Sequence, residues 1–445
     1  MTTDLFALPG EDGRIILYAP LAGFACKVDE DTMRWIAELD TRSEPVTDGP
    51  EKDVLDMLIR RNIVNGSRGM PQSIHGDFTL MPDKLALFLT GRCNLDCLYC
   101  YGRGRAGSVD DMPRETAFAA LNGYLKRLER EEKTLCMIEF HGGGEPFTAW
   151  PLMKDVVEEA EYRCGEKGIG LEVYAGTNGM LTPEQRKWVV RHMTSLTVSF
   201  DGPPHIQNLQ RPGLNGAPSF PRADETLRFF DREKLPYAVR CTVSGESQSE
   251  LEVVVNYLMD HYAVRIIFVE PMHTCRRSQT AGALTPPDME LFADQFVALE
   301  ETCRTRNVRL VYSGAIFERL VSHFCYVGTN NFAVTPDGFL TGCWEVADSS
   351  HPLSDRFLFG RLRADGSLEI DSEKLASLRA LSVENLPFCQ DCFAKWHCAG
   401  GCPMRRLREG AGADAEDSFC RTTRRLIAHQ IRRLAEETQI FQKIA

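Results

Sequence analysis

The chain has 445 residues, of which 43% are hydrophobic and 26% charged, and its net charge at neutral pH is −12. This length predicts two or three domains, and the composition is ordinary for a soluble globular protein. The acidic balance disfavours a general binder of the nucleic-acid backbone, because such a protein would present a concentrated basic face.

Neither a membrane span nor a secretion signal is indicated. No apolar run approaches the roughly 20 residues that a spanning helix needs. Residues 1–12 lack the basic region and apolar stretch of a signal peptide, so we expect a cytoplasmic protein in a reducing compartment. Its sixteen cysteines then need an explanation other than disulfides, and clusters at short fixed spacings favour metal ligands.

The first 75 residues predict a small module. Residues 15–18, a turn at residues 20–23, and residues 24–28 predict a β-hairpin. Two short amphipathic helices should follow. Their inward faces are expected to carry Met33, Ile36 and Leu39 in the first helix, and Val54, Leu55, Leu58 and Ile59 in the second. Residues 66–73 are a candidate linker.

From residue 85 the pattern changes to apolar strands separated by helix-length segments, which is typical of βα units and a parallel sheet. We expect six strands, at residues 85–90, 137–141, 171–175, 196–200, 237–243 and 266–270. Six such repeats predict an α/β fold with a partial (β/α)6 TIM-like barrel. Ligands of such a sheet gather at the carboxyl ends of the strands.

After about residue 320 the regular alternation stops. The chain becomes rich in cysteine, glycine and short loops before a terminal helix at roughly residues 419–440. Metal–thiolate bonds can organise a core that is too small to hold itself together. We therefore predict three domains, at residues 1–75, 80–315 and 320–445, and expect metal–thiolate bonds to stabilise the last one.

Three cysteines follow directly after the first of the six strands, in the sequence Cys93-Asn-Leu-Asp-Cys97-Leu-Tyr-Cys100. This spacing lets one loop bind three irons of a cubane cluster and leaves the fourth iron for a chelating substrate. A four-cysteine site would only relay electrons. The alternative is a zinc or structural iron site, although zinc normally takes four ligands.

This motif, with Tyr99 before its last cysteine, resembles the radical S-adenosylmethionine superfamily. The resemblance implies that S-adenosylmethionine chelates the open iron of a 4Fe-4S cluster, and that Tyr99 belongs to the cofactor site. Reductive cleavage of the sulfonium would then yield a 5′-deoxyadenosyl radical. An electron donor such as flavodoxin or ferredoxin is the implied partner.

Two further loops resemble cofactor loops of that superfamily. His141-Gly-Gly-Gly-Glu145-Pro146 closes the second strand, and glycines let backbone groups approach a small polar ligand closely. The resemblance places the cofactor's amino group against Gly143, Gly144 and Glu145. It places the cofactor's carboxylate against Ser199, which ends the fourth strand, and Arg211. A structural turn and a surface arginine are the alternatives. Two weaker matches are Thr177-Asn-Gly179 and Arg240.

Seven more cysteines lie within about a hundred residues, and their spacing resembles the SPASM extension of peptide-maturing and sulfatase-activating radical enzymes. The resemblance implies two auxiliary 4Fe-4S clusters, and so three clusters in all. The first would use Cys325, Cys343 and Cys402, and the second Cys389, Cys392, Cys398 and Cys420. With three motif ligands, the first could keep an open iron for a substrate thiolate. A pair of zinc ribbons is the alternative.

The six other cysteines fit no cluster spacing. Buried free cysteine commonly acts as a small apolar residue, so we expect these to be structural. They are Cys26, Cys136, Cys164, Cys241, Cys275 and Cys303.

The resemblance favours a peptide maturase that installs a thioether or carbon–carbon cross-link in a ribosomally made precursor peptide. Sulfatase-maturing relatives carry an acidic residue directly after the second cysteine of the extension, whereas this chain has Trp344 there and Glu345 one position later. A sulfatase maturase that forms formylglycine is therefore the second interpretation. A peptide epimerase and a non-catalytic electron carrier are further alternatives.

The module at residues 1–75 is similar to the small winged-helix-like domain with which peptide-modifying enzymes recognise a leader sequence. An exposed hairpin edge could pair with an extended leader and so tether the peptide near the radical. A plain capping domain is the alternative. We expect neither nucleic acid nor a membrane as a partner.

Overall fold

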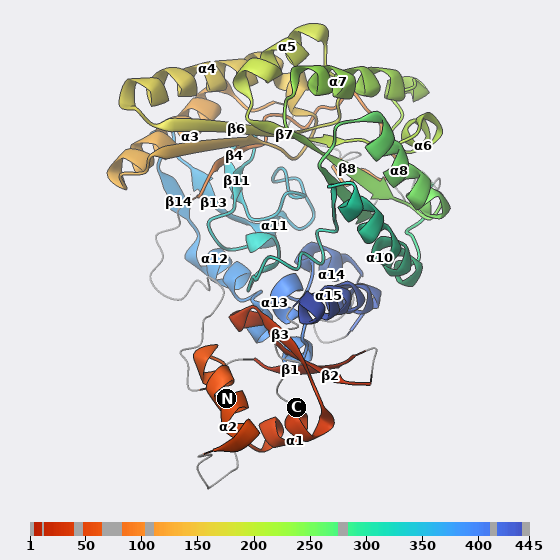
Figure 1. The fold of residues 1–445 in the computed structure, drawn as a ribbon. Coiled ribbons are helices and arrows are strands. Elements are labelled where there is room, and N and C mark those ends of the chain that lie inside the picture. Colours follow the sequence, from red (N-terminus) through yellow and green to blue (C-terminus); the bar gives the residue numbers. More distant parts are fainter. Residues whose placement is uncertain are drawn as a thin grey trace. The chain divides into compact units, whose positions relative to one another are not determined.

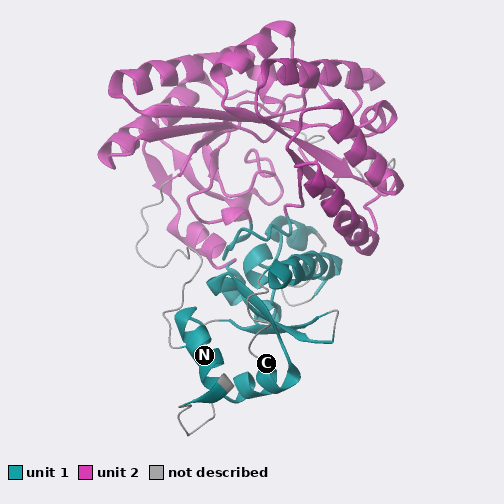
Figure 2. Ribbon diagram, in the orientation of Figure 1, with its two compact units in different colours: residues 1–75, 314–324, 382–445 teal, residues 76–313, 325–381 magenta. Residues whose placement is uncertain are grey.

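The computed structural model describes residues 4–10, 13–39, 48–64, 82–102, 111–274, 284–409 and 416–437. The chain divides into two compact units (Figure 2): unit 1 comprises residues 1–75, 314–324 and 382–445, and unit 2 comprises residues 76–313 and 325–381. The candidate linker at 66–73 and positions 438–440 of the predicted terminal helix lie outside the described residues. No helix in the described part of the chain combines the length and apolar character that crossing a membrane requires.

Unit 1 begins with a three-stranded antiparallel sheet in the order β1-β2-β3 (Figure 1). Strand β2 (Ile15–Ala19) and strand β3 (Phe24–Val28) form the predicted hairpin, so that prediction is confirmed. Gly23 has a left-handed φ of 57°, which glycine adopts without strain at the end of the turn. Strand β1 (Phe6–Pro9) was not predicted, because four residues ending in proline show no alternation.

Two helices pack on one face of this sheet. Helix α1 (Glu30–Glu38) is capped by Asp29, and helix α2 (Gly49–Arg60) follows it. Residues Ile36 and Leu58 are fully buried, as predicted, but Ile59 is 39% exposed. That placement corrects the prediction: the buried stripe of α2 runs through Met57 and Leu58, and Ile59 lies about 100° further around the helix.

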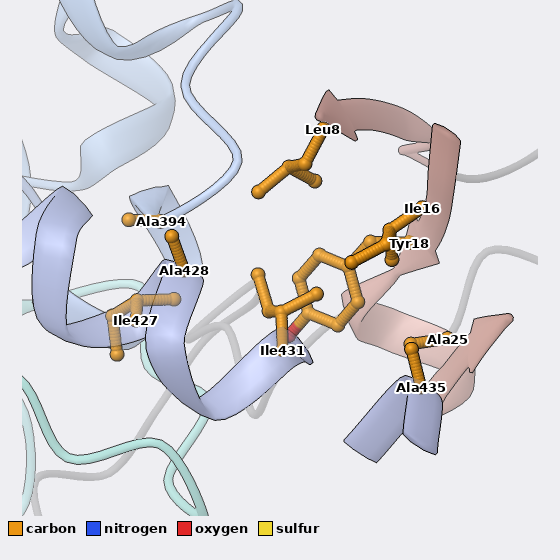
Figure 3. Packing of buried hydrophobic residues seen from close by; sticks show 9 residues of the cluster. All are labelled: Leu8, Ile16, Tyr18, Ala25, Ala394, Ile427, Ala428, Ile431 and Ala435. Atoms are coloured by element: carbon orange, nitrogen blue, oxygen red, sulfur yellow. The ribbon is translucent and has the colours of Figure 1, made fainter. Parts of the chain in front are cut away.

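The other face of the sheet packs against the last described helix, α15 (Ser418–Glu437). Figure 3 shows Leu8, Ile16 and Tyr18 directed toward Ile431 and its neighbours on α15. The start of the chain therefore shares one hydrophobic core with a helix encoded some 400 residues later. The remaining elements of unit 1 are short: η6 (Val383–Asn385), η7 (Pro387–Cys389), α13 (Lys395–Cys398) and α14 (Pro403–Glu409).

Unit 2 is built on an 11-stranded sheet in the order β10-β9-β8-β7-β6-β5-β4-β11-β12-β13-β14. The six predicted strands are all present and pair in parallel, which confirms them. They are β4 (Leu85–Leu87), β5 (Leu135–Phe140), β6 (Gly170–Thr177), β7 (Ser195–Ser199), β8 (Tyr237–Val243) and β9 (Ile266–Pro271).

Five further strands extend this sheet and were not predicted. Strand β10 (Arg309–Val311) adds in parallel beside β9. On the other side, β11 (Ala333–Val334) pairs in parallel with β4, although the sequence shows no alternation there. The remaining three are antiparallel: β12 (Phe339–Thr341), β13 (Leu358–Leu362) and β14 (Leu368–Ile370). With two to five residues each, these strands are too short to give a period-2 signal.

Helices cover one face of the sheet, with α4, α5 and α7 lying over it in Figure 1. Alternate strand residues such as Cys136, Ile138 and Phe140 are fully buried, whereas Glu139 and His141, on the opposite face of β5, are half-buried. The face turned away from α4, α5 and α7 is therefore the polar one. The helices are α3 (Arg114–Arg130), α4 (Trp150–Lys167), α5 (Pro183–His192), α6 (Pro204–Gln210), α7 (Phe220–Glu233), α8 (Leu251–His261), α10 (Met289–Thr305), α11 (Ser354–Phe357) and α12 (Ser372–Arg379).

Candidate functional site

The loop with the first three cysteines follows β4 at the carboxyl edge of the sheet. Its backbone is held by hydrogen bonds to the end of α6 and the residues after it: the amide of Asp96 donates to the Pro212 carbonyl at 2.8 Å, and the amide of Leu98 donates to the Gln210 carbonyl at 3.0 Å. The loop is therefore fixed by its own backbone to a neighbouring part of the sheet edge.

The three thiols of this loop are neighbours. Burial, opposed by the charge of Arg211 and reinforced by Cys100 and Cys93, raises the pKa of Cys97 to about 12. Without a metal, the Cys97 side chain is thus a neutral thiol, and a bound metal would have to displace its proton.

These residues fit an iron–sulfur cluster better than a single ion. Among the residues that the structure describes, no three His, Cys, Asp or Glu side chains converge on the position of one metal ion. A four-iron cluster keeps its thiolates further apart, because each binds a different iron. Three neighbouring thiols on one loop meet that requirement, whereas a structural zinc site calls for four converging ligands.

A buried network links this loop to the end of β7. The Tyr99 hydroxyl donates to Asp201 Oδ2 at 2.7 Å and accepts a hydrogen bond from Arg211. Asp201 is fully buried and also accepts from Gln210 Nε2 at 2.9 Å and from the Thr242 amide at 3.0 Å. The Arg211 guanidinium, only 7% exposed, keeps an Nε without a hydrogen-bond partner.

The network contains residues that the sequence analysis missed. Asp201 stands two residues after Ser199 in the motif Ser-Phe-Asp-Gly-Pro, and Gln210 directly precedes Arg211. The predicted cofactor residues Tyr99 and Arg211 are brought together here, and their hydroxyl and guanidinium groups contact each other. A charged residue at the carboxyl end of an otherwise apolar strand was the signal that could have identified Asp201.

Glu145 lies at the same carboxyl edge of the sheet, beside the ends of β5 and β6. Its carboxylate accepts hydrogen bonds from Thr177 Oγ1 at 2.8 Å, the Asn178 amide at 2.7 Å and the Phe147 amide at 3.3 Å. Burial raises the pKa of Glu145 from its ordinary value of 4.5 to about 7, although these donors and Arg211 oppose the shift. The carboxyl group is therefore held by the protein itself and gains a proton near neutral pH.

Asn178 connects Glu145 to the cysteine loop. Its side-chain Nδ2 donates to Asn94 Oδ1 at 2.7 Å and reaches Cys93 Sγ at 3.8 Å, while its backbone amide binds Glu145. The sequence analysis gave Thr177-Asn-Gly179 only as a weak match. The structure places its middle residue between two candidate site residues, so this short motif is part of the site.

The glycines after β5 allow a close approach of two backbones. The amide of Gly144 donates to the Thr90 carbonyl at 2.8 Å, and a Cβ at Gly144 would stand 1.9 Å from the Arg92 carbonyl oxygen. Gly143 has a φ of 64°, and a Cβ there would lie 2.7 Å from the Thr90 oxygen. Both glycines are therefore needed to pack this loop against the residues that precede Cys93.

The other predicted cofactor residue of this edge, Ser199, ends β7 and pairs in register with Arg240 of β8. Arg240 Nη1 lies 3.5 Å from Glu270 Oε1, and Ser313 Oγ also donates to that carboxylate. These side chains lie on the polar face of the sheet, turned away from α4, α5 and α7. This face thus presents a polar surface beside the cysteine loop.

Trp344, directly after Cys343, also lies against this face. Its ring packs edge-on against Phe88 at 5.9 Å and lies 6.4 Å from His141, whose pKa burial lowers to about 4. The neighbouring Glu345 is directed elsewhere: its Oε1 lies 3.9 Å from Nε2 of the buried His351. The acidic side chain one position after Trp344 is thus in contact with a buried histidine.

The second cysteine set divides between the units. The predicted group Cys389, Cys392, Cys398 and Cys420 lies wholly in unit 1. Burial, reinforced by Cys392 and Cys420 and opposed by Arg406 and Lys395, raises the pKa of Cys389 to about 12. Burial, reinforced by Cys392, Cys389 and Cys420, raises the pKa of Cys398. Four neighbouring thiols with cationic side chains around them fit a cluster whose thiolates carry net negative charge.

Cys325 and Cys343 belong to unit 2 and Cys402 to unit 1, so the ligand set of the other auxiliary cluster stays a prediction. Of the cysteines expected to be structural, Cys275 lies outside the described residues. The other five are buried, free thiols: Cys26, Cys136, Cys164, Cys241 and Cys303.

Comparison with known proteins points to one group of enzymes, although no family model matches the chain. A cysteine-type anaerobic sulfatase-maturating enzyme of Clostridium perfringens is 22% identical over 362 residues, which cover 77% of this chain and 94% of that protein. A serine-type enzyme of Klebsiella aerogenes is 22% identical over 335 residues, covering 70% and 77% of the two chains.

Solved structures show the same fold. The structure of the Clostridium enzyme anSMEcpe with bound S-adenosylmethionine matches with a TM-score of 0.62 at 18% identity, and covers 81% of this chain and 97% of that one. The structure of Streptococcus suis SuiB bound to its precursor peptide SuiA matches with a TM-score of 0.54 at 12% identity, and covers 94% and 99% of the two chains. Both matches extend well beyond the parallel sheet.

Proposed function

We propose that this chain, a homologue of the anaerobic sulfatase-maturating enzymes, is a radical S-adenosylmethionine enzyme that modifies a peptide. The observation that carries the proposal is the group of three neighbouring thiols, Cys93, Cys97 and Cys100, at the carboxyl edge of a parallel sheet. When bound there, a 4Fe-4S cluster with S-adenosylmethionine supplies a 5′-deoxyadenosyl radical that can abstract a hydrogen atom from carbon.

The protein's own residues would bind and orient the cofactor. Arg211 is a buried cation whose Nε is without a partner, which suits it to a carboxylate. The Tyr99 hydroxyl accepts a hydrogen bond from that guanidinium and is itself held by Asp201. Gly143 and Gly144 bring the backbone beside the cysteine loop, and Glu145, at the end of this glycine run, is the proposed partner of an amino group.

The finer architecture is part of the same proposal. We assign the sheet of unit 2 to a partial barrel, the first residues to a winged-helix-like module and the cysteine-rich segments to a SPASM domain with two auxiliary clusters. The enzyme would work in a reducing compartment and take electrons from a flavodoxin or ferredoxin. The three-domain division at residues 1–75, 80–315 and 320–445 stays a prediction.

A ribosomally made peptide with a leader sequence is the proposed substrate. SuiB, which shares the fold over nearly the whole chain, was solved with a precursor peptide bound. In the sheet β1-β2-β3, the outer edge of β3 has no strand beside it among the described residues, so an extended leader could add there. The expected product is a thioether or carbon–carbon cross-link, with epimerisation as an alternative outcome.

A sulfatase maturase is the second candidate, favoured by the match to 94% of the Clostridium enzyme. The residue after Cys343 argues against it, because Trp344 offers no base and Glu345 contacts the buried His351. An assay with a cysteine-containing sulfatase peptide decides between the two. Formation of an aldehyde would favour the sulfatase maturase, and an unmodified peptide would favour the precursor-peptide substrate.

Two measurements test the main proposal. Anaerobically reconstituted protein with dithionite should convert S-adenosylmethionine into 5′-deoxyadenosine, whereas Cys97→Ala should not, and Cys136→Ala, a buried cysteine outside the motif, should behave like the parent. Co-expression with a short peptide encoded beside this gene, followed by mass spectrometry, should show the loss of two hydrogens for a cross-link. Absence of 5′-deoxyadenosine from iron-loaded protein would refute the radical mechanism.

A further inference from the structure

The short helix α13 follows Cys392 and ends at Cys398, and both cysteines belong to the four-thiol group in unit 1. Its first three side chains are nearly inaccessible: Lys395 is 6% exposed, and Trp396 and His397 are each 1% exposed. Successive helical residues point about 100° apart, so these three side chains leave the helix in different directions. Residues from more than one segment of unit 1 must therefore bury them, and these contacts restrain the loop.

Asp4 contacts two of the three side chains. The Trp396 indole Nε1 donates to Asp4 Oδ2 at 2.6 Å, and Lys395 Nζ lies 3.0 Å from the same oxygen. Lys395 also donates to the Gln390 carbonyl at 2.9 Å, and thereby ties Asp4 to the turn between Cys389 and Cys392. A buried lysine needs such partners, because an unpaired buried charge is strongly unfavourable.

Tyr18 of β2 contacts the third side chain. Its hydroxyl lies 2.6 Å from His397 Nε2, and both side chains are almost completely buried. The ring of Phe317 stacks on His397 with centroids 5.0 Å apart. The backbone is held as well, since the Val321 amide donates to the Trp396 carbonyl at 2.7 Å. His397 is thus held by Tyr18 of the sheet and by Phe317, and the neighbouring backbone of Trp396 is held by Val321.

We infer that Asp4 and Tyr18 are positioning residues for the four-cysteine group Cys389, Cys392, Cys398 and Cys420. The amino-terminal sheet, which has no cysteine in that group, holds the segment that sets the distance between Cys392 and Cys398. This role rests on the proposed assignment of the group to an iron–sulfur cluster. Because coupling between two parts of a protein is reciprocal, the bound cluster in turn stabilises the sheet.

The coupling deepens the proposed peptide recognition. A leader peptide that adds to β3 binds only the formed sheet, and the sheet is formed more fully when the cluster holds α13. The four-cysteine group is then a structural part of the peptide-binding unit in addition to any role in electron transfer. Loss of the cluster should weaken peptide binding even where no chemistry takes place.

The test uses the full chain with Cys93, Cys97 and Cys100 all replaced by serine, so that only auxiliary clusters contribute to the signal. Asp4→Asn removes the negative charge that faces Lys395, and Tyr18→Phe removes the hydroxyl that faces His397, both with little change in volume. Asp29→Ala is the matched control in the same unit, because Asp29 caps α1 by accepting from the Thr32 amide at 2.7 Å and does not contact α13. Tyr124→Phe, a buried tyrosine of unit 2, is the second control.

After anaerobic reconstitution, the rate of iron loss to a chelator and the electron paramagnetic resonance spectrum of the reduced protein are measured. Asp4→Asn and Tyr18→Phe should each release one cluster's share of iron roughly tenfold faster, the factor that corresponds to 1.4 kcal/mol. They should also change the spectrum or reduction potential of that cluster. Asp29→Ala should lower thermal stability while leaving the spectrum unchanged.

Iron loss and spectra that match both controls would overturn the positioning role. Protein that takes up zinc and no iron would instead overturn the cluster assignment, so the two failures are distinguishable. In the chain with Cys93, Cys97 and Cys100 intact, the rate of 5′-deoxyadenosine formation without peptide should stay unchanged in both variants. A parallel loss of that activity would indicate general unfolding in place of a local role.

Discussion

Replacement of Asp201 by asparagine should destabilise unit 2 strongly in the protein without clusters. Asp201 is fully buried and accepts three hydrogen bonds, from Tyr99, Gln210 and Thr242. The asparagine side chain would have nearly the same size but no charge, so Arg211, which is linked to Asp201 through the Tyr99 hydroxyl, would remain as a buried cation without this nearby anion. Breaking one side of a buried charge pair costs about 3–5 kcal/mol. At 2–4 °C per kcal/mol for a unit of this size, the melting temperature should fall by roughly 10 °C.

The chain contains a matched control, a second group of one aspartate, one tyrosine and one arginine. Asp224 accepts from the Tyr262 hydroxyl at 2.6 Å and from Arg228 Nε at 3.0 Å, but Asp224 and Arg228 are 19% and 46% exposed. Asp224→Asn should therefore cost at most about 1 kcal/mol. Thermal unfolding of both variants would be followed by circular dichroism in reduced, iron-free protein.

A cluster-loaded sample sharpens the test. The thiolates that bind iron bring negative charge close to Arg211, whereas in the metal-free protein Cys97 is a neutral thiol because burial raises its pKa. The Asp201→Asn shift should accordingly be smaller with the cluster than without it. Equal shifts for Asp201→Asn and Asp224→Asn in iron-free protein would refute the reasoning that a buried anion is required beside Arg211.

Three further predictions address the same edge of the sheet. Glu145→Gln should remove a pH dependence of stability. Because folding raises the pKa of Glu145 from 4.5 to about 7, the stabilising contribution of Glu145 is full below pH 4.5 and is lost as the pH rises to 7. The loss should be roughly 3 kcal/mol at most, as urea titrations at several pH values would show. A difference between variant and parent that is constant over this pH range would contradict the shift. Gly144→Ala should displace the Cys93 loop and abolish cluster binding in an iron assay, because the added Cβ stands 1.9 Å from the Arg92 carbonyl oxygen. Gly165→Ala is the control: Gly165 is helical and a Cβ there meets nothing within 4 Å, so the free energy of unfolding should rise by about 0.5–1 kcal/mol. Normal iron content in Gly144→Ala would show that the two backbones can separate. Arg211→Gln should raise the Kd for S-adenosylmethionine by about 10–100-fold in equilibrium dialysis, as expected for loss of a charged hydrogen bond of about 1.5–3 kcal/mol. Arg228 is half-exposed, and Arg228→Gln should leave that Kd unchanged.

The sequence predicted the parallel sheet well because its strands are long and buried on alternate positions. The six strands between residues 85 and 270 were each identified within a few residues, and the cysteine loop was placed correctly after the first of them. Strands β10 and β11 were missed, because two or three residues can form a strand only when a neighbouring strand is already there. Their formation depends on the rest of the sheet and not on their own sequence.

Within the site, the sequence indicated the residue types better than their contacts. Tyr99 and Arg211 were both predicted to bind cofactor, but nothing in the sequence indicated that they bind each other or that Tyr99 also binds Asp201. Asn178 was part of a weak motif and proves to connect Glu145 to Asn94. Pairings of this kind arise from strands that are distant in the chain, so short-range patterns carry no information on them.

The same long-range dependence is strongest in unit 1. The module at residues 1–75 was predicted as a separate recognition domain, and its hairpin and helices are present. Deleting it would also remove Leu8, Ile16 and Tyr18 from the core that contains Ile431 of α15. Such a deletion would therefore disturb the whole of unit 1, and point substitutions are the better probe of its function.

The packing of β2 on α15 also determines when unit 1 can fold during protein synthesis. Ile16 and Tyr18 leave the ribosome long before their partners Ile427 and Ile431. At about 5–20 residues per second, roughly 20–80 s separate the two segments. Throughout that interval one apolar face of the sheet lacks its covering helix and is open to chaperones or to aggregation. Cys420 lies on the same late helix, so the proposed cluster of the four-cysteine group could be completed only after α15 has been made.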